Sequence, residues 1–486
     1  MEFNIDQPTQ KFTNHLSVPF NDRIIFSGPF GTGKTYFLEK YFENNPNYNV
    51  IHLFPVNYSV ASNEDIFELI KYDVLFELLG KEVDFDKIEI SHLEFFKKFA
   101  LRNAHHILAP FLNFLPEIGK SVHTVYEKLQ ALGEKYFVEY EGANTDDKQA
   151  VIDYLGNFTK TKGSIFEEDF YTQLICQSIE QLKIELETDK KCETVLIIDD
   201  LDRIDPEHIF RILNVLSAHM DAKGESGNKF NFDKIILVFD QQNVHKIFQN
   251  RYGSNVDFSG YIDKFYSHKI FEFENIEGVN QKILEFLQNI EIPKSDKFSD
   301  FHSPSNVLSQ NVQYIFSGLV KAKQITIRRL KKVLGKKFLR IKYNPRFGNN
   351  QQRFLNSQLE ICLIFEFLFM FYGSWDEIID ALEKSNDFDY NNDSLYRFLS
   401  FALTALDSDQ HKFKIQNEKM SFNHQKTNQY IEYNTLRSGE YQTSFLAGVY
   451  LVSTFENKTE ESIPVKYFPI LTDTAKKLKE WDSIRI

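Results

Sequence analysis

The stretch "GPFGTGKT", from Gly28 to Thr35, decides the fold of this chain. It fits the pattern G-x-x-x-x-G-K-[ST], in which a glycine-rich backbone wraps its N–H groups around a phosphate group. The preceding "RIIFS" (23–27) is typical of a buried strand, and "TYFLEKYFEN" (35–44) has apolar residues at helical spacing. The sequence therefore predicts a strand, a loop and a helix in that order, which is the context that the pattern requires.

The residue types in this stretch suit the binding of a polyphosphate. Glycines let the backbone N–H groups converge on an anion, and the following helix start adds unpaired N–H groups and the positive end of its dipole. Lys34 is a candidate catalytic charge for the terminal phosphates, and the hydroxyl of Thr35 can bind Mg2+. The alternative is a glycine-rich turn that matches by chance. The residues expected to hold the nucleotide are Gly28, Pro29, Phe30, Gly31, Thr32, Gly33, Lys34, Thr35 and Tyr36.

A second segment, "TVLIIDDLDRIDPEH" (194–208), has the features expected of the other half of the site. Val195 to Ile198 predicts a buried strand, and two acids follow at its carboxyl end, where parallel sheets bind ligands. We expect Asp199 to hold Mg2+ through water, and Asp200 to act catalytically by polarising the attacking water. An acidic helix cap is the alternative, because "DPEH" is a good helix start, and the two functions are compatible.

A third apolar run, from Ile235 to Phe239, ends at Asp240 and precedes a helical pattern. A polar residue at this position can contact the terminal phosphate or the water, or it can cap the helix. Both interpretations of Asp240 stay open.

The segment from Lys321 to Arg346 contains eleven Lys or Arg residues and no acids. Its apolar residues are spaced for one helical face, so it is either a lid helix, a stripe that follows a nucleic-acid backbone, or a solvated cationic face. We favour the lid, with Arg328 as a further catalytic residue that contacts the phosphates. Nucleic-acid binding is possible but not favoured, because the whole chain carries a net charge of −13.

An ATPase that self-assembles needs an arginine or a lysine supplied in trans. The candidates are Arg203, Arg251 and Lys264, and for each of them a salt bridge within the chain is the favoured interpretation. A homo-oligomer is therefore left open.

Four segments in order, "GPFGTGKT", "LIIDDLDRIDP", "ILVFDQQNV" and "YIDKFYSHKIFEF", resemble the KAP family of P-loop NTPases over roughly residues 20–345. "DDLDR" is the most specific piece. The resemblance implies an ATPase core with an additional strand, and a helical region inserted between the two main motifs. It also implies a place in signalling complexes or in bacterial exclusion of phage. Many family members carry transmembrane helices in the insertion, and none is expected here. Arg328 resembles the second sensor of AAA-like ATPases.

The expected cofactors are ATP and Mg2+. Guanine-specific proteins usually carry an Asn/Thr-Lys-x-Asp element, and the nearest match, "NKTE" at Asn457, ends in Glu and lies far beyond the core.

The predicted fold class is α/β: a P-loop NTPase parallel sheet flanked by helices, with additions. We predict core residues 1–62 and 191–275, a helical insertion at 63–190, a helical lid at 276–345 and a mainly helical C-terminal domain at 346–486. Within that domain, the stretch from Ser438 to Phe455 is compatible with strand or helix. No leader is visible, and the most apolar run, from Ile361, contains Glu366, so we expect a buried core helix there and a cytoplasmic protein without a membrane span.

The favoured function is an ATP-dependent switch within a complex whose protein partner is expected to be encoded nearby. The alternatives are a scaffold that binds nucleotide without turnover and a nucleic-acid-associated ATPase motor.

Overall fold

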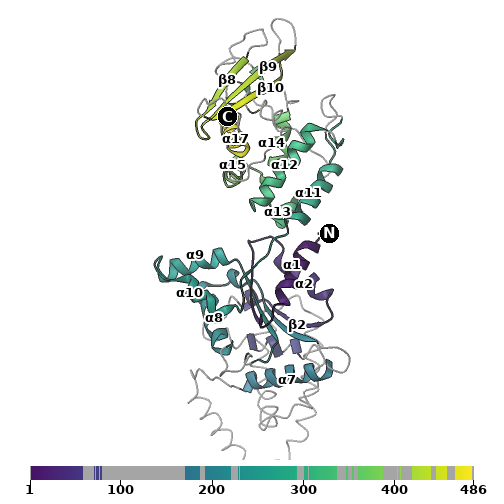
Figure 1. The fold of residues 1–486 in the computed structure, drawn as a ribbon, viewed down its shortest axis with the longest axis vertical. Coiled ribbons are helices and arrows are strands. Elements are labelled where there is room, and N and C mark those ends of the chain that lie inside the picture. The colour runs from purple at the N-terminus through teal and green to yellow at the C-terminus, as the bar shows by residue number, and fades with distance from the viewer. Residues whose placement is uncertain are drawn as a thin grey trace, which may run out of the picture. The chain divides into compact units, whose positions relative to one another are not determined.

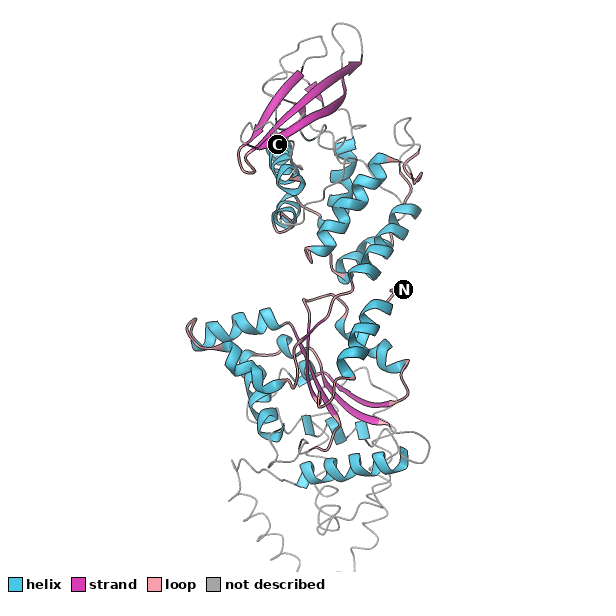
Figure 2. Ribbon diagram, viewed as in Figure 1, coloured by secondary structure: helices cyan, strands magenta, loops and turns pink. Residues whose placement is uncertain are grey.

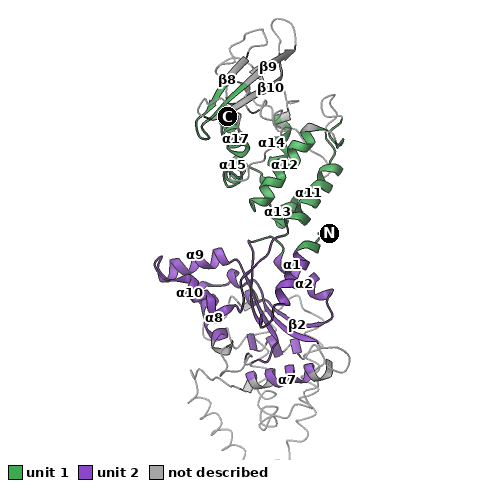
Figure 3. Cartoon of the chain, in the orientation of Figure 1, with its two compact units in different colours: residues 1–7, 30–33, 275–486 green, residues 8–29, 34–274 purple. Residues whose placement is uncertain are grey.

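The computed structural model describes residues 2–58, 70–71, 73–75, 77–78, 170–186, 192–220, 228, 230–292, 300–304, 306–336, 346–347, 353–354, 360–386, 402, 406, 419–438, 445–456 and 466–483. The chain forms two compact units. One comprises residues 8–29 and 34–274, and the other comprises residues 1–7, 30–33 and 275–486 (Figure 3).

The first unit is built on a parallel sheet flanked by helices (Figures 1 and 2). The sheet has five strands in the order β2-β3-β4-β1-β5. β4 lies between β1 and β3, which confirms the additional strand that the family resemblance implies. Every residue of β4 is buried, as its continuous apolar run predicts for the centre of a parallel sheet. The strands are β1 (Arg23–Ser27), β2 (Tyr48–Leu53), β3 (Glu193–Ile198), β4 (Lys234–Phe239) and β5 (Phe271–Glu272).

One face of the sheet is covered by α1 (Asp6–Leu16) and α2 (Lys34–Glu43), largely through aromatic rings. Phe12 of α1 is fully buried, and its ring centroid lies 5.2 Å from that of Phe26 in β1 and 4.9 Å from that of Tyr41 in α2. Edge-to-face contacts of this kind add specific geometry to the burial of apolar area.

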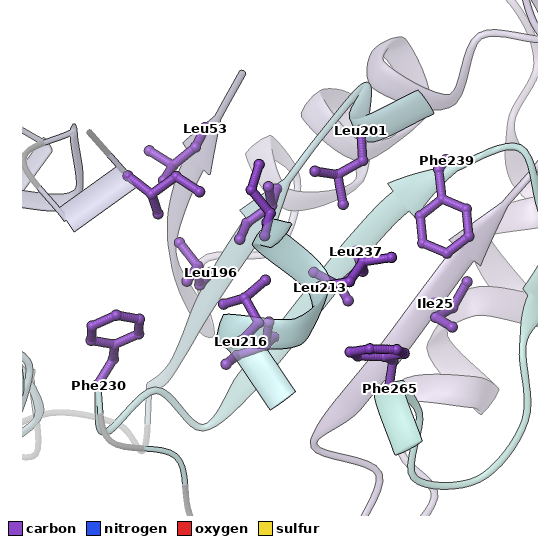
Figure 4. Packing of buried hydrophobic residues seen from close by; sticks show 14 of the residues in the cluster. Ile25, Leu53, Leu196, Leu201, Leu213, Leu216, Phe230, Leu237, Phe239 and Phe265 are labelled. Carbon is purple, nitrogen blue, oxygen red and sulfur yellow. The ribbon is translucent and has the colours of Figure 1, made fainter. Parts of the chain in front are cut away.

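The other face is covered by four helices: α7 (Phe170–Leu186), α8 (Pro206–Met220), α9 (Gln241–Tyr252) and α10 (Phe258–Ile262). Figure 4 shows Leu213 and Leu216 of α8 among the side chains of β3 and β4. α8 begins at Pro206, where "DPEH" predicts a helix start, and Asp205 accepts a hydrogen bond from the backbone N–H of Glu207 (2.8 Å).

The predicted insertion at 63–190 is described only between residues 70 and 78, where the described residues are helical, and in α7. The rest of it lies outside the described residues, and its helical nature there stays a prediction.

Among its described residues, the second unit has six helices of eight or more residues and two small sheets. α14 is the helix predicted from the most apolar run, and Glu366 within it is 6% exposed. A Cβ atom placed on Gly318 of α12 would lie 2.4 Å from the ring of Phe468 in α17, so glycine permits this close approach. Among the described residues, no helix combines the length and the apolarity that crossing a bilayer requires. The helices are α11 (Ile276–Asn289), α12 (Val307–Lys321), α13 (Ile327–Leu334), α14 (Glu360–Tyr372), α15 (Trp375–Glu383) and α17 (Tyr467–Ser483).

A three-stranded antiparallel sheet follows α15, formed by β8 (Lys419–His424), β9 (Gln429–Ser438) and β10 (Phe445–Glu456). The sequence of the stretch from Ser438 to Phe455 is compatible with strand or helix. Its described residues, 438 and 445–455, lie in strands. The short strands β6 (Arg346–Phe347) and β7 (Arg353–Phe354) form a separate pair. The buried His424 lies with its Nε2 atom 3.1 Å from Asp473 Oδ2, which ties β8 to α17.

Candidate nucleotide-binding site

The loop between β1 and α2 has backbone angles that its glycines make accessible. Gly31 and Gly33 have φ angles of +75° and +89°, which residues with a side chain rarely adopt. A Cβ atom on Gly28 would lie 3.2 Å from the carbonyl oxygen of Phe273. Helix α2 begins directly after this loop, so N–H groups of the loop and of the helix start are available together, as an anion-binding nest requires.

Lys34 lies folded back along this loop. Its Nζ atom donates a hydrogen bond to the carbonyl oxygen of Gly28 (2.7 Å), and the residue is 6% exposed. A lysine held in this way presents a positive charge at the loop, where terminal phosphates are expected.

Thr35 and Asp199, which are 164 residues apart in the chain, meet at the carboxyl ends of β1 and β3. The Thr35 hydroxyl donates a hydrogen bond to Asp199 Oδ2 (2.8 Å), and Asp199 is fully buried. The structure thus brings together the two residues expected at the magnesium ion.

These oxygen groups fit Mg2+. A hydroxyl and one carboxylate are hard ligands, and Mg2+ is commonly held by one or two carboxylates together with substrate phosphates and water. In the part of the chain that the structure describes, no cluster of three or more His, Cys, Asp or Glu side chains could hold a metal ion alone. Thr35 and Asp199 would hold Mg2+, and the ion would neutralise the charge on the phosphates.

His52, at the end of β2, was not identified from the sequence. Its Nε2 atom lies 3.1 Å from Asp199 Oδ2. A polar residue in the apolar run "VIHLF" is the signal that could have revealed it.

Asp200 adopts a left-handed conformation, with φ 55° and ψ 32°. Its Oδ2 atom accepts a hydrogen bond from Arg203 Nη1 (2.5 Å), so the proposed water-polarising carboxylate is ion-paired within the chain. Such backbone strain is often concentrated at functional sites.

The other two candidates for a residue acting in trans also have partners within the chain. Arg251 pairs with Glu207 (3.2 Å), and Lys264 Nζ lies 4.9 Å from the ring centroid of Tyr261. For Arg203 and Arg251, these contacts agree with the favoured interpretation of salt-bridge partners.

Asp240 caps α9: its Oδ1 atom accepts hydrogen bonds from the backbone N–H groups of Gln242 (3.0 Å) and Asn243 (3.2 Å). The cap interpretation is thus observed, and contact with a phosphate stays a prediction. The backbone N–H of Asp240 in turn donates to Asp202 Oδ2 (3.0 Å).

Asp202 is the third acid of "DDLDR" and was also not identified as a site residue from the sequence. Its other oxygen, Oδ1, is buried and makes no hydrogen bond. Burial raises the pKa of this carboxyl above its usual value, and the nearby charge of Asp240 adds to that effect, whereas the hydrogen bond from Asp240 and the charge of Lys34 oppose it.

The start of α13 packs on the tip of the phosphate loop. A Cβ atom on Gly33 would lie 2.7 Å from Ile327 Cδ1, and one on Gly31 would lie 3.2 Å from the Cβ atom of Thr326 and 3.5 Å from that of Arg328. Thr326 caps α13 by accepting a hydrogen bond from the backbone N–H of Arg329 (3.2 Å). Arg328 thus lies beside the tip of the loop, and its contact with phosphate stays a prediction.

The described part of the cationic segment, residues 321–336, has a buried apolar side and an exposed basic side, as both the lid and the solvated-face interpretations predict. Ile327, Leu330 and Val333 are buried, while Arg328, Lys331, Lys332 and Lys336 are exposed. Arg329 Nη1 donates to Glu377 Oε2 (2.8 Å) and to the carbonyl oxygen of Phe371 (3.1 Å), so part of the positive charge is used within the unit.

Comparison with known proteins agrees with this geometry. The model of the KAP family P-loop domain matches residues 21–357 of the chain. No curated protein sequence matches the chain.

Proposed function

Because the chain belongs to the KAP family of P-loop NTPases, we propose that it hydrolyses ATP with Mg2+ and uses the cycle as a switch. The contact between Thr35 and Asp199 carries the proposal (2.8 Å), since it joins the phosphate loop to the acidic end of β3. That contact is the arrangement in which P-loop enzymes bring Mg2+ to the nucleotide.

In this proposal each residue has a separate task. The N–H groups of residues 28–36 bind the phosphates, Lys34 neutralises charge on them, and Asp200 orients the attacking water. Arg328 reaches the phosphates from α13. Phosphoryl transfer needs mainly positioning of the reactants and stabilisation of charge, and these residues are of the kinds that supply both.

The unit structure supports a switch. Residues 30–33, at the tip of the phosphate loop, belong to the same compact unit as α13 and the C-terminal region (Figure 3). A nucleotide that changes the loop therefore acts directly on residues that pack against Thr326 and Ile327. In thermodynamic terms, ATP shifts the population toward the state whose loop and α13 fit it best.

Two variants test the enzyme. Lys34→Ala should abolish nucleotide binding, whereas Asp200→Asn should keep binding and stop turnover. Lys40→Ala is a matched control, because it removes a lysine from the exposed side of α2, where Lys40 pairs with Glu43 (2.6 Å). The proposal fails if both site variants hydrolyse ATP at the wild-type rate, measured as phosphate release.

One observation favours a second candidate, a scaffold that holds nucleotide without turnover. The Arg203–Asp200 ion pair (2.5 Å) already engages Asp200 Oδ2, one of the two oxygens that could orient the attacking water. Multiple turnovers in a steady-state phosphate assay support the switch, and one equivalent or less of product per chain supports the scaffold.

The proposed setting is a cytoplasmic complex with a protein partner encoded nearby, in signalling or in defence against phage. Co-purification with the products of neighbouring genes, followed by mass measurement with and without ATP, tests the partner and the oligomeric state. Plaque counts with wild-type and Lys34→Ala chains test the defence role.

A further inference from the structure

The side chain of His52, from β2, lies at the acidic end of β3. Its Nε2 atom lies 3.1 Å from Asp199 Oδ2, and its side chain is 16% exposed. None of the tasks assigned above involves this histidine.

The backbone fixes His52 relative to Asp199. β2 and β3 pair in parallel, with His52 opposite Ile197, and the N–H of Asp199 donates to the carbonyl oxygen of Leu53 (2.9 Å). The imidazole also stacks on Phe54, with ring centroids 4.4 Å apart and an interplanar angle of 26°. The ring is therefore held in place from two sides.

The hydrogen-bonding capacity of Asp199 gives this position a consequence. A carboxylate that takes up a cation is ionised and only accepts hydrogen bonds, at about four lone-pair sites, so the His52 tautomer that fits this site carries its proton on Nε2. Thr35 and His52 donate to Oδ2, and the N–H of Asp200 donates to Oδ1 (2.6 Å). These three donors orient the carboxylate and leave about one acceptor site for water bound to a metal ion.

We propose that His52 is a positioning residue for Mg2+, which holds the Asp199 carboxylate ready for the hydrated ion. This inference rests on the proposed function, because it concerns the same metal site. Hydrogen-bond partners of metal-binding side chains fix their orientation, and their loss typically costs about 10- to 100-fold in metal affinity.

The test measures the affinity for a fluorescent ATP analogue across a Mg2+ titration and in EDTA. His52→Phe keeps a ring that can stack on Phe54 but cannot donate a hydrogen bond, and His52→Ala removes both. Both variants should need about 10- to 100-fold more Mg2+ for half-maximal tightening, with unchanged affinity in EDTA. His52→Gln, which retains an N–H donor, should recover part of the loss.

His245→Ala is the matched control. This histidine also stacks on a phenylalanine, Phe258, with ring centroids 4.6 Å apart and an interplanar angle of 14°, but it lies in α9. Its Mg2+ requirement should equal that of the wild type.

The outcomes separate the two proposals. If His52→Phe has the wild-type Mg2+ requirement, the inference about His52 is overturned while the proposed function stands, and this variant decides even if His52→Ala fails to fold. If the wild type binds no nucleotide, or binds it equally well without Mg2+, the proposed function fails first and the inference fails with it.

Discussion

Gly33→Ala should weaken nucleotide binding by about 30- to 150-fold. The residue has a φ angle of +89°, and a side chain in the left-handed region costs roughly 1–2 kcal/mol. The new Cβ atom would also lie 2.7 Å from Ile327 Cδ1, so this buried side chain must leave its rotamer, at about 1 kcal/mol. If the loop relaxes when nucleotide leaves, the two costs together, about 2–3 kcal/mol, are subtracted from the free energy of nucleotide binding. Each 1.4 kcal/mol corresponds to a tenfold loss of affinity.

Equilibrium titration with a fluorescent ATP analogue measures this loss. Adding Ile327→Ala to Gly33→Ala removes the obstructing methyl group and should recover about fivefold, the equivalent of 1 kcal/mol. Gly373→Ala is the control, because Gly373 has a similar φ angle of +84° and no atom within 4 Å of an added Cβ. The reasoning is refuted if Gly33→Ala binds within twofold of the wild type. It is also refuted if the double variant binds no better than Gly33→Ala.

Three further predictions concern charged residues. Asp202→Asn removes a buried carboxyl whose pKa is raised, and it keeps an oxygen that can accept the hydrogen bond from the N–H of Asp240. In the wild type, ionisation of Asp202 lowers the free energy of unfolding as pH rises above 3.8. At pH 7 and without nucleotide, the variant should therefore unfold at no lower temperature than the wild type. A fall of several degrees in a thermal scan would contradict this. Arg328→Ala should weaken ATP binding about tenfold and ADP binding much less, since it removes one charged contact to the terminal phosphate, and equal losses by calorimetry would count against it. Burial opposes ionisation of Asp233, but hydrogen bonds, including one from Lys183, outweigh it and hold its pKa below 3.8. Its stabilisation is therefore present above pH 3.8 and lost as pH falls further, so urea midpoints of Asp233→Asn between pH 3 and 6 should fall less steeply with acid than those of the wild type.

The core strands could be predicted because each is a short apolar run beside a recognisable motif. "RIIFS" is β1 as predicted, and Ile235 to Phe239 forms all but the first residue of β4. Helix α1 was not predicted, because Phe12 and Leu16 are its only large apolar residues; it is held by Phe12, whose partners in β1 and α2 are distant in sequence. Tertiary packing of this kind overrides local propensity.

The candidate site likewise contains residues that could be predicted from the sequence and residues that could not. The roles expected of Thr35 and Asp199 follow from motifs, and the structure places the two side chains in contact (2.8 Å). His52 and Asp202 could not be assigned, because their positions depend on which strands are neighbours. β2 has to lie beside β3 for His52 to reach Asp199, and β4 has to lie beside β3 for Asp202 to meet the N–H of Asp240. Residue spacing along the chain carries no information on strand order.

β4 acts as the spacer that sets the width between the two strands that carry the candidate nucleotide site. It pairs with β1 on one side and with β3 on the other, so the strands that carry the two halves of the site stand two strand spacings apart, about 9.5 Å. Since every residue of β4 is buried, any change in its side-chain volume alters that width or the tilt of its neighbours. A genetic screen for temperature-sensitive alleles should therefore recover substitutions in β4. The variant proteins should accumulate normally but lose function on warming.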